Sequence, residues 1–164
     1  MNSKVNKRKL HKTIECELDV LLQTAKDAAL QAYETATNKE TVAENKYDTF
    51  ALEASYLAAG QSKRIKLYEE NIDAFKTIEP RCFSSDDPIT LGALVVLIGI
   101  DGEQKHYFIS PVSGGLKVEY NSQQVFLVTP RAPLAKAMAG LVEGDEFEIV
   151  IGGKPQLYSV LSVS

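Results

Sequence analysis

Apolar residues in the first half of the chain recur at alternating intervals of three and four positions. One run comprises Ile14, Leu18, Leu21, Ala25, Ala28 and Ala32. A second run comprises Tyr47, Ala51, Ala54, Ala58, Gln61, Ile65, Tyr68, Ile72 and Phe75. This spacing places each run on one narrow helix face and is typical of the seam of a two-stranded coiled coil. We therefore predict two helices that pack along their seams.

The segment TATNKETVAEN between the two runs is polar and predicts a reversal of the chain. Antiparallel pairing brings Ala32 next to Ala51 and Leu18 next to Ile65, with the reversal near residue 41. Each arm of about thirty residues would be roughly 45 Å long at 1.5 Å per residue. Because the seam contains alanine near the reversal and bulkier residues at the other end, we expect the helices to approach most closely near the tip.

The second half of the chain changes to short alternating segments separated by glycine. Six of these segments predict strands, at residues 91–100, 105–111, 115–120, 123–130, 145–151 and 156–163, and residues 132–141 predict a helix. Asp101-Gly102 and Gly152-Gly153 are typical hairpin turns. The fold class is therefore predicted to be α+β, with a two-helix coiled coil followed by a small antiparallel sheet and one helix.

Pro80 and Pro88 bracket a segment rich in serine and aspartate, which predicts a linker. On this basis the chain has three parts. They are a helical hairpin at residues 1–79 with its tip at about 36–48, a linker at 80–90, and a C-terminal domain at 91–164.

Composition narrows the class of protein. With 45% hydrophobic and 24% charged residues, the chain is predicted to be globular. The longest apolar stretch, Leu91 to Ile100, is too short to cross a membrane, and the N-terminus lacks the apolar region of a secretion signal. We therefore expect a cytoplasmic protein that does not act at a membrane.

No pattern of a catalytic centre is present. Cys16 and Cys82 form no metal or disulfide framework, and His11 and His106 lie far from both in sequence. Hydrolase elbows, phosphate-binding loops and dinucleotide fingerprints are missing from the sequence. We expect no active site of its own and no small-molecule substrate.

The first twelve residues are basic although the whole chain has a net charge of -4. The cations are Lys4, Lys7, Arg8, Lys9 and Lys12. A solvated, frayed terminus is the simpler interpretation. Contact with nucleic acid or with an acidic protein surface is the alternative.

Three acidic residues at the predicted tip, Glu40, Glu44 and Asp48, are spaced by four. One interpretation is structural, since Thr41 and Glu44 have the spacing of a capping box and acids stabilise the first turns of a helix. The other is functional. Converging carboxylates could hold Mg²⁺ weakly, in a site completed by a partner that already holds a metal and a phosphodiester.

Two motifs resemble those of the bacterial Gre transcript-cleavage factors, GreA and GreB. Glu44-Asn45 with Tyr47 close behind is similar to the family's tip motif. PLAKAMAGLVEGDEFEI, from Pro133 to Ile149, is similar to the family's C-terminal run and is the more specific of the two. The resemblance extends from about Ile14 to Val163.

This resemblance implies an FKBP-like C-terminal domain that docks on the rim of the secondary channel of RNA polymerase. The docking domain would include Pro133, Leu134, Met138 and Gly140. The tip would enter the channel, where Glu44, with Glu40 and Asp48 as auxiliary ligands, would hold Mg²⁺ beside the catalytic ion. Asn45, Lys46 and Tyr47 would be tip contacts. The polymerase would cleave the backtracked RNA, so the factor would meet nascent RNA only indirectly and would not be an enzyme.

Three positions depart from the family pattern, and one of them is Tyr47, which comes one residue earlier than in the family motif. Thr41 occupies the position of the family's tip aspartate, and Ala132 replaces the serine before Pro133, which removes an expected helix cap. Two alternatives therefore stay open. One is a Gre-like channel binder that regulates or inhibits polymerase without stimulating cleavage, and the other is a coiled-coil adaptor unrelated to polymerase.

Overall fold

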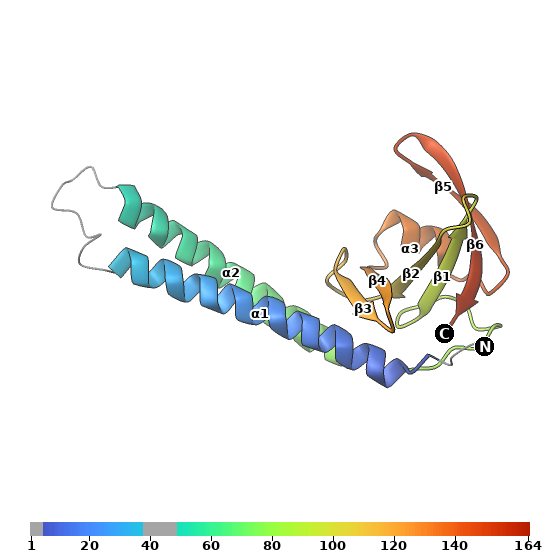
Figure 1. Ribbon diagram of the computed structural model, residues 1–164, viewed down its shortest axis with the longest axis horizontal. Coiled ribbons are helices and arrows are strands. Elements are labelled where there is room, and N and C mark those ends of the chain that lie inside the picture. The colour runs from blue at the N-terminus through green and yellow to red at the C-terminus, as the bar shows by residue number, and fades with distance from the viewer. Residues whose placement is uncertain (1–4, 38–48) are drawn as a thin grey trace. The chain divides into compact units, whose positions relative to one another are not determined.

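The computed structural model describes residues 5–37 and 49–164. Two long helices, α1 (Lys7–Thr37) and α2 (Thr49–Lys76), precede the sheet and a short third helix (Figure 1). The chain forms two compact units. One contains Cys16–Asp73, and the other contains the residues up to Glu15 together with Ala74–Ser164. None of the helices in the described ranges is long and apolar enough to cross a lipid bilayer.

Helix α1 begins with an asparagine cap. The Asn6 side-chain oxygen accepts a hydrogen bond from the Lys9 amide at 3.0 Å, and the Asn6 carbonyl accepts one from the Leu10 amide at 3.0 Å. Asparagine is among the preferred residues at this position because its side chain satisfies an amide that the helix leaves free.

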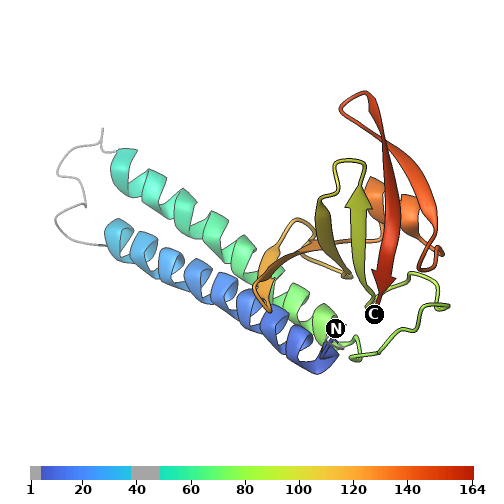
Figure 2. The same ribbon diagram turned by 45° about the vertical axis from the view of Figure 1, so that its right-hand side comes forward.

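In the unit Cys16–Asp73, α1 and α2 lie side by side and run in opposite directions (Figures 1 and 2). Leu18, Ala25 and Ala32 of α1 are buried, as the seam pattern predicts. In α2, every predicted seam position from Ala58 to Phe75 is buried or half-buried. An ion pair between Lys26 Nζ and Glu69 Oε1, at 3.6 Å, joins the two helices beside the seam. The predicted two-helix coiled coil is confirmed, whereas the reversal near residue 41 lies outside the described residues.

The C-terminal part contains one six-stranded sheet in the order β3-β4-β2-β1-β6-β5. The strands are β1 (Leu94–Gly99), β2 (Gln104–Ile109), β3 (Lys117–Tyr120), β4 (Gln123–Val128), β5 (Glu146–Ile151) and β6 (Lys154–Val163). The α+β class and all six predicted strands are confirmed. The turns at Asp101-Gly102 and Gly152-Gly153 connect the pairs β1–β2 and β5–β6, which are antiparallel.

The sheet is mixed, so the expectation of a wholly antiparallel sheet was wrong at one pair. Strand β4 pairs with β2 in parallel, with His106 opposite Val125 and Ile109 opposite Val128. The cause is the order of the β3–β4 hairpin, which places its second strand next to β2. Asn121 and Ser122, both with positive φ, form its tight turn.

One face of the sheet packs against α3 (Pro133–Met138) and contains the main core. Val95, Leu97 and Val160 from the sheet pack with Met138 of α3. The cap position of α3 is Ala132, which makes no side-chain hydrogen bond, and Pro133 follows in the first turn. The sequence predicted that Ala132 would provide no side-chain cap for this helix, and the structure confirms that prediction.

The seam gives a stability prediction. We expect Leu18→Ala to lower the free energy of unfolding by about 2–5 kcal/mol, because the 1% exposed side chain would leave a cavity between the helices. Val20→Ala, on the exposed side of the same helix at 52% exposure, is the matched control and should change stability by less than about 0.5 kcal/mol. Urea unfolding followed by circular dichroism measures both. Equal effects of the two substitutions would contradict a packed seam.

Candidate functional site

The predicted acidic tip lies outside the described residues. It comprises Glu40, Glu44, Asn45, Lys46, Tyr47 and Asp48, and also Thr41. The structure shows the elements that flank it, with α1 ending at Thr37 and α2 beginning at Thr49. Within the described ranges, no group of three or more His, Cys, Asp or Glu side chains is placed to hold a metal ion. The predicted Mg²⁺ ligands therefore stay a prediction about the tip.

The four residues predicted in the docking domain have different environments. Pro133 and Gly140 are exposed and Leu134 is half-buried. Gly140 has a φ of +79°, and its amide donates to the Ile89 carbonyl at 3.0 Å. Met138 is fully buried in the main core, so it supports α3 from within and offers no surface to a partner.

The first turns of α1 contain a buried lysine. Lys7 is only 3% exposed, and its Nζ donates a hydrogen bond of 2.7 Å to the Gly92 carbonyl. The same nitrogen lies over the rings of Phe83 and Phe108, at 5.2 and 5.4 Å from their centroids. A carbonyl and two aromatic faces thus replace part of the water that the ammonium loses.

One turn later His11 is also buried, at 4% exposure. Its ring lies 5.3 Å from Phe75 and 5.4 Å from Phe108, the second contact being edge to face. His11 Nε2 is buried and has no hydrogen-bond partner in the described part of the chain. We call Lys7, His11, Phe75, Phe83 and Phe108 the anchor cluster.

Burial shifts the titration of both polar members of the anchor cluster. Desolvation lowers the pKa of Lys7 from 10.5 to about 7. Desolvation, followed by the nearby positive charge of Lys7, lowers the pKa of His11 from 6.5 to about 4. At neutral pH His11 is therefore uncharged, and Lys7 exists in both its charged and neutral forms.

Further hydrogen bonds attach the start of α1 to the sheet. The Asn6 amide donates to Tyr120 Oη at 3.1 Å, and that hydroxyl lies 3.2 Å from the Asn6 carbonyl oxygen. Lys9 Nζ donates to Asn121 Oδ1 at 3.2 Å. These contacts contradict the expectation of a solvated, frayed terminus from Asn6 onward. Lys7, His11 and Ile14 continue the intervals of four and three, a signal in the sequence that could have revealed the anchor.

The fold therefore defines a class of protein in which an antiparallel helical hairpin accompanies a small α+β domain. The chain is 27% identical over 147 residues to the transcription elongation factor GreA of Paracoccus denitrificans, covering 90% of this chain and 88% of that protein. This relative confirms the resemblance to the Gre family.

No protein-family model matches the chain. Among solved structures, Gfh1 of Thermus thermophilus is 18% identical, with a TM-score of 0.39 over 92% of this chain and 94% of that one. GreA/GreB from Nitrosomonas europaea is also 18% identical, with a TM-score of 0.36 over 62% of this chain and 78% of that one. The resemblance to the Gre family thus rests on the sequence similarity to GreA.

The anchor cluster gives a pH prediction. The unfolded chain binds more protons than the folded chain between pH 7 and 10.5 because of Lys7, and between pH 4 and 6.5 because of His11. Both groups therefore make the folded state more stable as pH rises through these windows. We expect Lys7→Met to stabilise the protein most at and below pH 7, with the gain relative to wild type shrinking toward pH 10.

Urea unfolding at pH 5, 7 and 9.5 tests this expectation. Lys12→Met is the control, because Lys12 lies on the exposed side of the same helix turn. If the difference in unfolding free energy between wild type and Lys7→Met were the same at all three pH values, the interpretation of Lys7 as a buried lysine with a lowered pKa would be contradicted.

Proposed function

We propose that the protein is a transcription elongation factor that binds RNA polymerase and uses its helical hairpin to present the acidic segment at residues 40–48. The observation that carries this proposal is the 27% identity with GreA across 90% of the chain, which includes both the hairpin and the sheet. The confirmed seam supports it, because two closely packed helices are narrow enough to present a tip to a channel.

The carboxylates of Glu44, Glu40 and Asp48 would hold Mg²⁺ when the tip lies beside the polymerase's own catalytic ion. Magnesium prefers oxygen ligands and usually takes one or two protein carboxylates, with water or phosphate oxygens as its other ligands. An ion held there can lower the pKa of a bound water, which supplies a nucleophile for cleavage of the RNA. The factor would contribute ligands, and the polymerase would contribute the active site.

In this division of roles the protein is an accessory factor of RNA polymerase and is not itself an enzyme. RNA polymerase is the proposed partner, and nascent RNA is met only inside it. No small-molecule substrate and no membrane is part of the proposal.

Thr41 favours a second candidate, in which the protein binds the same channel and regulates or inhibits polymerase without stimulating cleavage. A threonine hydroxyl is a neutral ligand and attracts Mg²⁺ less than the aspartate of the family motif does. The two candidates share polymerase binding and differ only in cleavage.

The tip carboxylates can be tested in stalled, backtracked complexes of bacterial RNA polymerase. We expect the triple variant Glu40→Ala, Glu44→Ala, Asp48→Ala to lose stimulated RNA cleavage by at least about tenfold, because even residues that only support metal ligands are worth about 10- to 100-fold. Binding to polymerase should persist. Lys39→Ala, a neighbouring change that removes no carboxylate, is the control.

Thr41→Asp separates the two candidates. It should raise cleavage above that of wild type, because it restores the carboxylate of the family motif. If wild type and Thr41→Asp both bind polymerase and neither stimulates cleavage, cleavage stimulation is contradicted and the regulatory candidate stands. Wild type that does not bind polymerase would overturn both candidates.

A further inference from the structure

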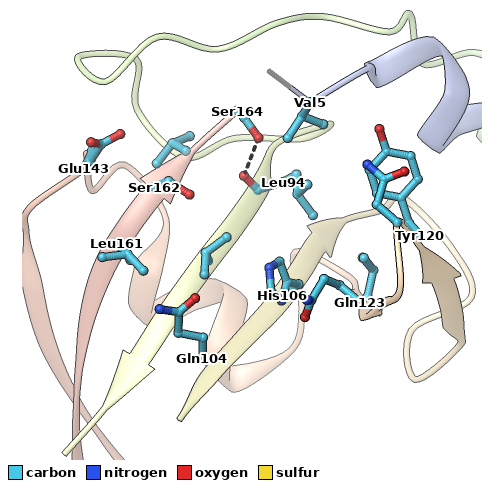
Figure 3. A pocket seen from close by; sticks show the side chains of 14 residues that line it. Val5, Leu94, Gln104, His106, Tyr120, Gln123, Glu143, Leu161, Ser162 and Ser164 are labelled. Atoms are coloured by element: carbon cyan, nitrogen blue, oxygen red, sulfur yellow. Dashed lines mark hydrogen bonds between the residues drawn. The ribbon is translucent and has the colours of Figure 1, made fainter. Parts of the chain in front are cut away.

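Two of the hollows in the described ranges differ in the elements that line them. A hollow of about 640 Å³ on the sheet is lined by side chains from several strands, among them His106 and Leu161 (Figure 3). A smaller hollow of about 410 Å³ is lined by residues of a single helix, α2. Residues three and four positions apart share one face of a helix, so the spacing along α2 indicates which helix could pack there.

The hollow on α2 opens beside a glycine. Its lining residues are Tyr56, Leu57, Gly60, Gln61 and Arg64. A side-chain carbon at Gly60 would meet no atom within 4 Å, so the helix backbone is open at this point. Leu57 beside it is 59% exposed, and Gln61 Oε1 is buried without a hydrogen-bond partner in the described part of the chain. Exposed apolar side chains beside an acceptor that lacks a donor favour a protein partner.

The hollow is part of a longer stripe on α2. The members of this stripe follow intervals of three, four and three, and all are exposed. They are Leu57, Gly60, Arg64 and Leu67, which we call the α2 stripe. The stripe is apolar at both ends and cationic between them, and the exposed Lys63 and Lys66 beside it add positive charge.

Helix α1 has a second stripe with the same spacing and the opposite charge. Its members, which we call the α1 stripe, are Val20, Gln23, Asp27 and Leu30. All are exposed, with Val20 at 52% and Leu30 at 57%. Gln23 Nε2 donates a hydrogen bond of 2.8 Å to Asp27 Oδ1, so the polar pair in the middle of the stripe is held together.

The two stripes match when their helices run in opposite directions. Val20 and Leu30 are as far apart in sequence as Leu57 and Leu67, which corresponds to about 15 Å of helix. If Val20 faces Leu67, then Leu30 faces Leu57.

The same register brings the polar middles of the stripes together. Gln23 then faces Arg64, and Asp27 faces Gly60, one helix turn from Arg64. The open backbone at Gly60 leaves room for the carboxylate to approach the guanidinium. Within one chain α1 and α2 pack through their seam, and both stripes stay exposed, so pairing the stripes requires a second copy.

We propose that the hairpin self-associates, with the α1 stripe of one copy packed against the α2 stripe of a second copy. Leu30 of one copy enters the hollow of the other, and Asp27 with Gln23 binds Arg64. Charge favours this arrangement, because two α2 stripes flanked by lysine would repel each other. A contact about 15 Å long is short for the roughly 800 Å² per partner of a standard interface, so the association is weak and depends on concentration.

The experiment measures association of the full-length chain by sedimentation equilibrium over about a hundredfold range of protein concentration. Asp27→Arg and Arg64→Asp each place like charges opposite one another, so each should weaken association by at least about tenfold. An equimolar mixture of the two variants should associate about as strongly as wild type, because each variant then meets the opposite charge on the other. Recovery in the mixture also shows that both variants are folded.

Two charge reversals away from the stripes are matched controls. Glu119→Arg on β3 and Lys136→Asp on α3 alter exposed residues and should leave association unchanged. Leu30→Asp tests the hollow itself and should weaken association by at least about tenfold, since it places a carboxylate against apolar side chains. Thermal unfolding of each variant verifies that the fold is retained.

Loss of association in Asp27→Arg and in Arg64→Asp, with recovery in their mixture, supports the proposal. Wild type that stays monomeric over the whole concentration range overturns it, and so does association that neither variant weakens. Loss in both variants without recovery in the mixture also overturns it, because Asp27 and Arg64 would then not face each other. None of these measurements contains polymerase, so the proposed function is tested separately.

Discussion

The interaction on which the helical hairpin depends is the packing of α1 against α2 along one narrow apolar seam. Leu18, Ala25 and Ala32 are buried on α1, although most of the surrounding helix surface is polar and exposed. Alanine at this seam lets the helix backbones approach closely, and the gain from packing must exceed the entropy lost on ordering about sixty residues.

The start of α1 is stabilised in a less usual way. Lys7 and His11 are buried among Phe75, Phe83 and Phe108, in a position where two apolar residues would cost less desolvation. The Gly92 carbonyl and the aromatic faces compensate Lys7, whereas His11 Nε2 has no partner within the described ranges. The contact is therefore sensitive to pH, because protonation places charge in an apolar environment.

Much of the fold could be predicted from local patterns in the sequence. Because of helix geometry, apolar residues at intervals of three and four form a seam along one helix face. Alternating apolar and polar residues specify the strands, and Asp101-Gly102 and Gly152-Gly153 specify the turns between them. All of these signals depend only on residues that lie close together in the chain. Tertiary structure alone decided the parallel pairing of β4 with β2 and the residues that Lys7 and His11 contact. Each of these depends on segments that lie far apart in sequence, as Lys7 does from Gly92, and local periodicity contains no information about such pairs.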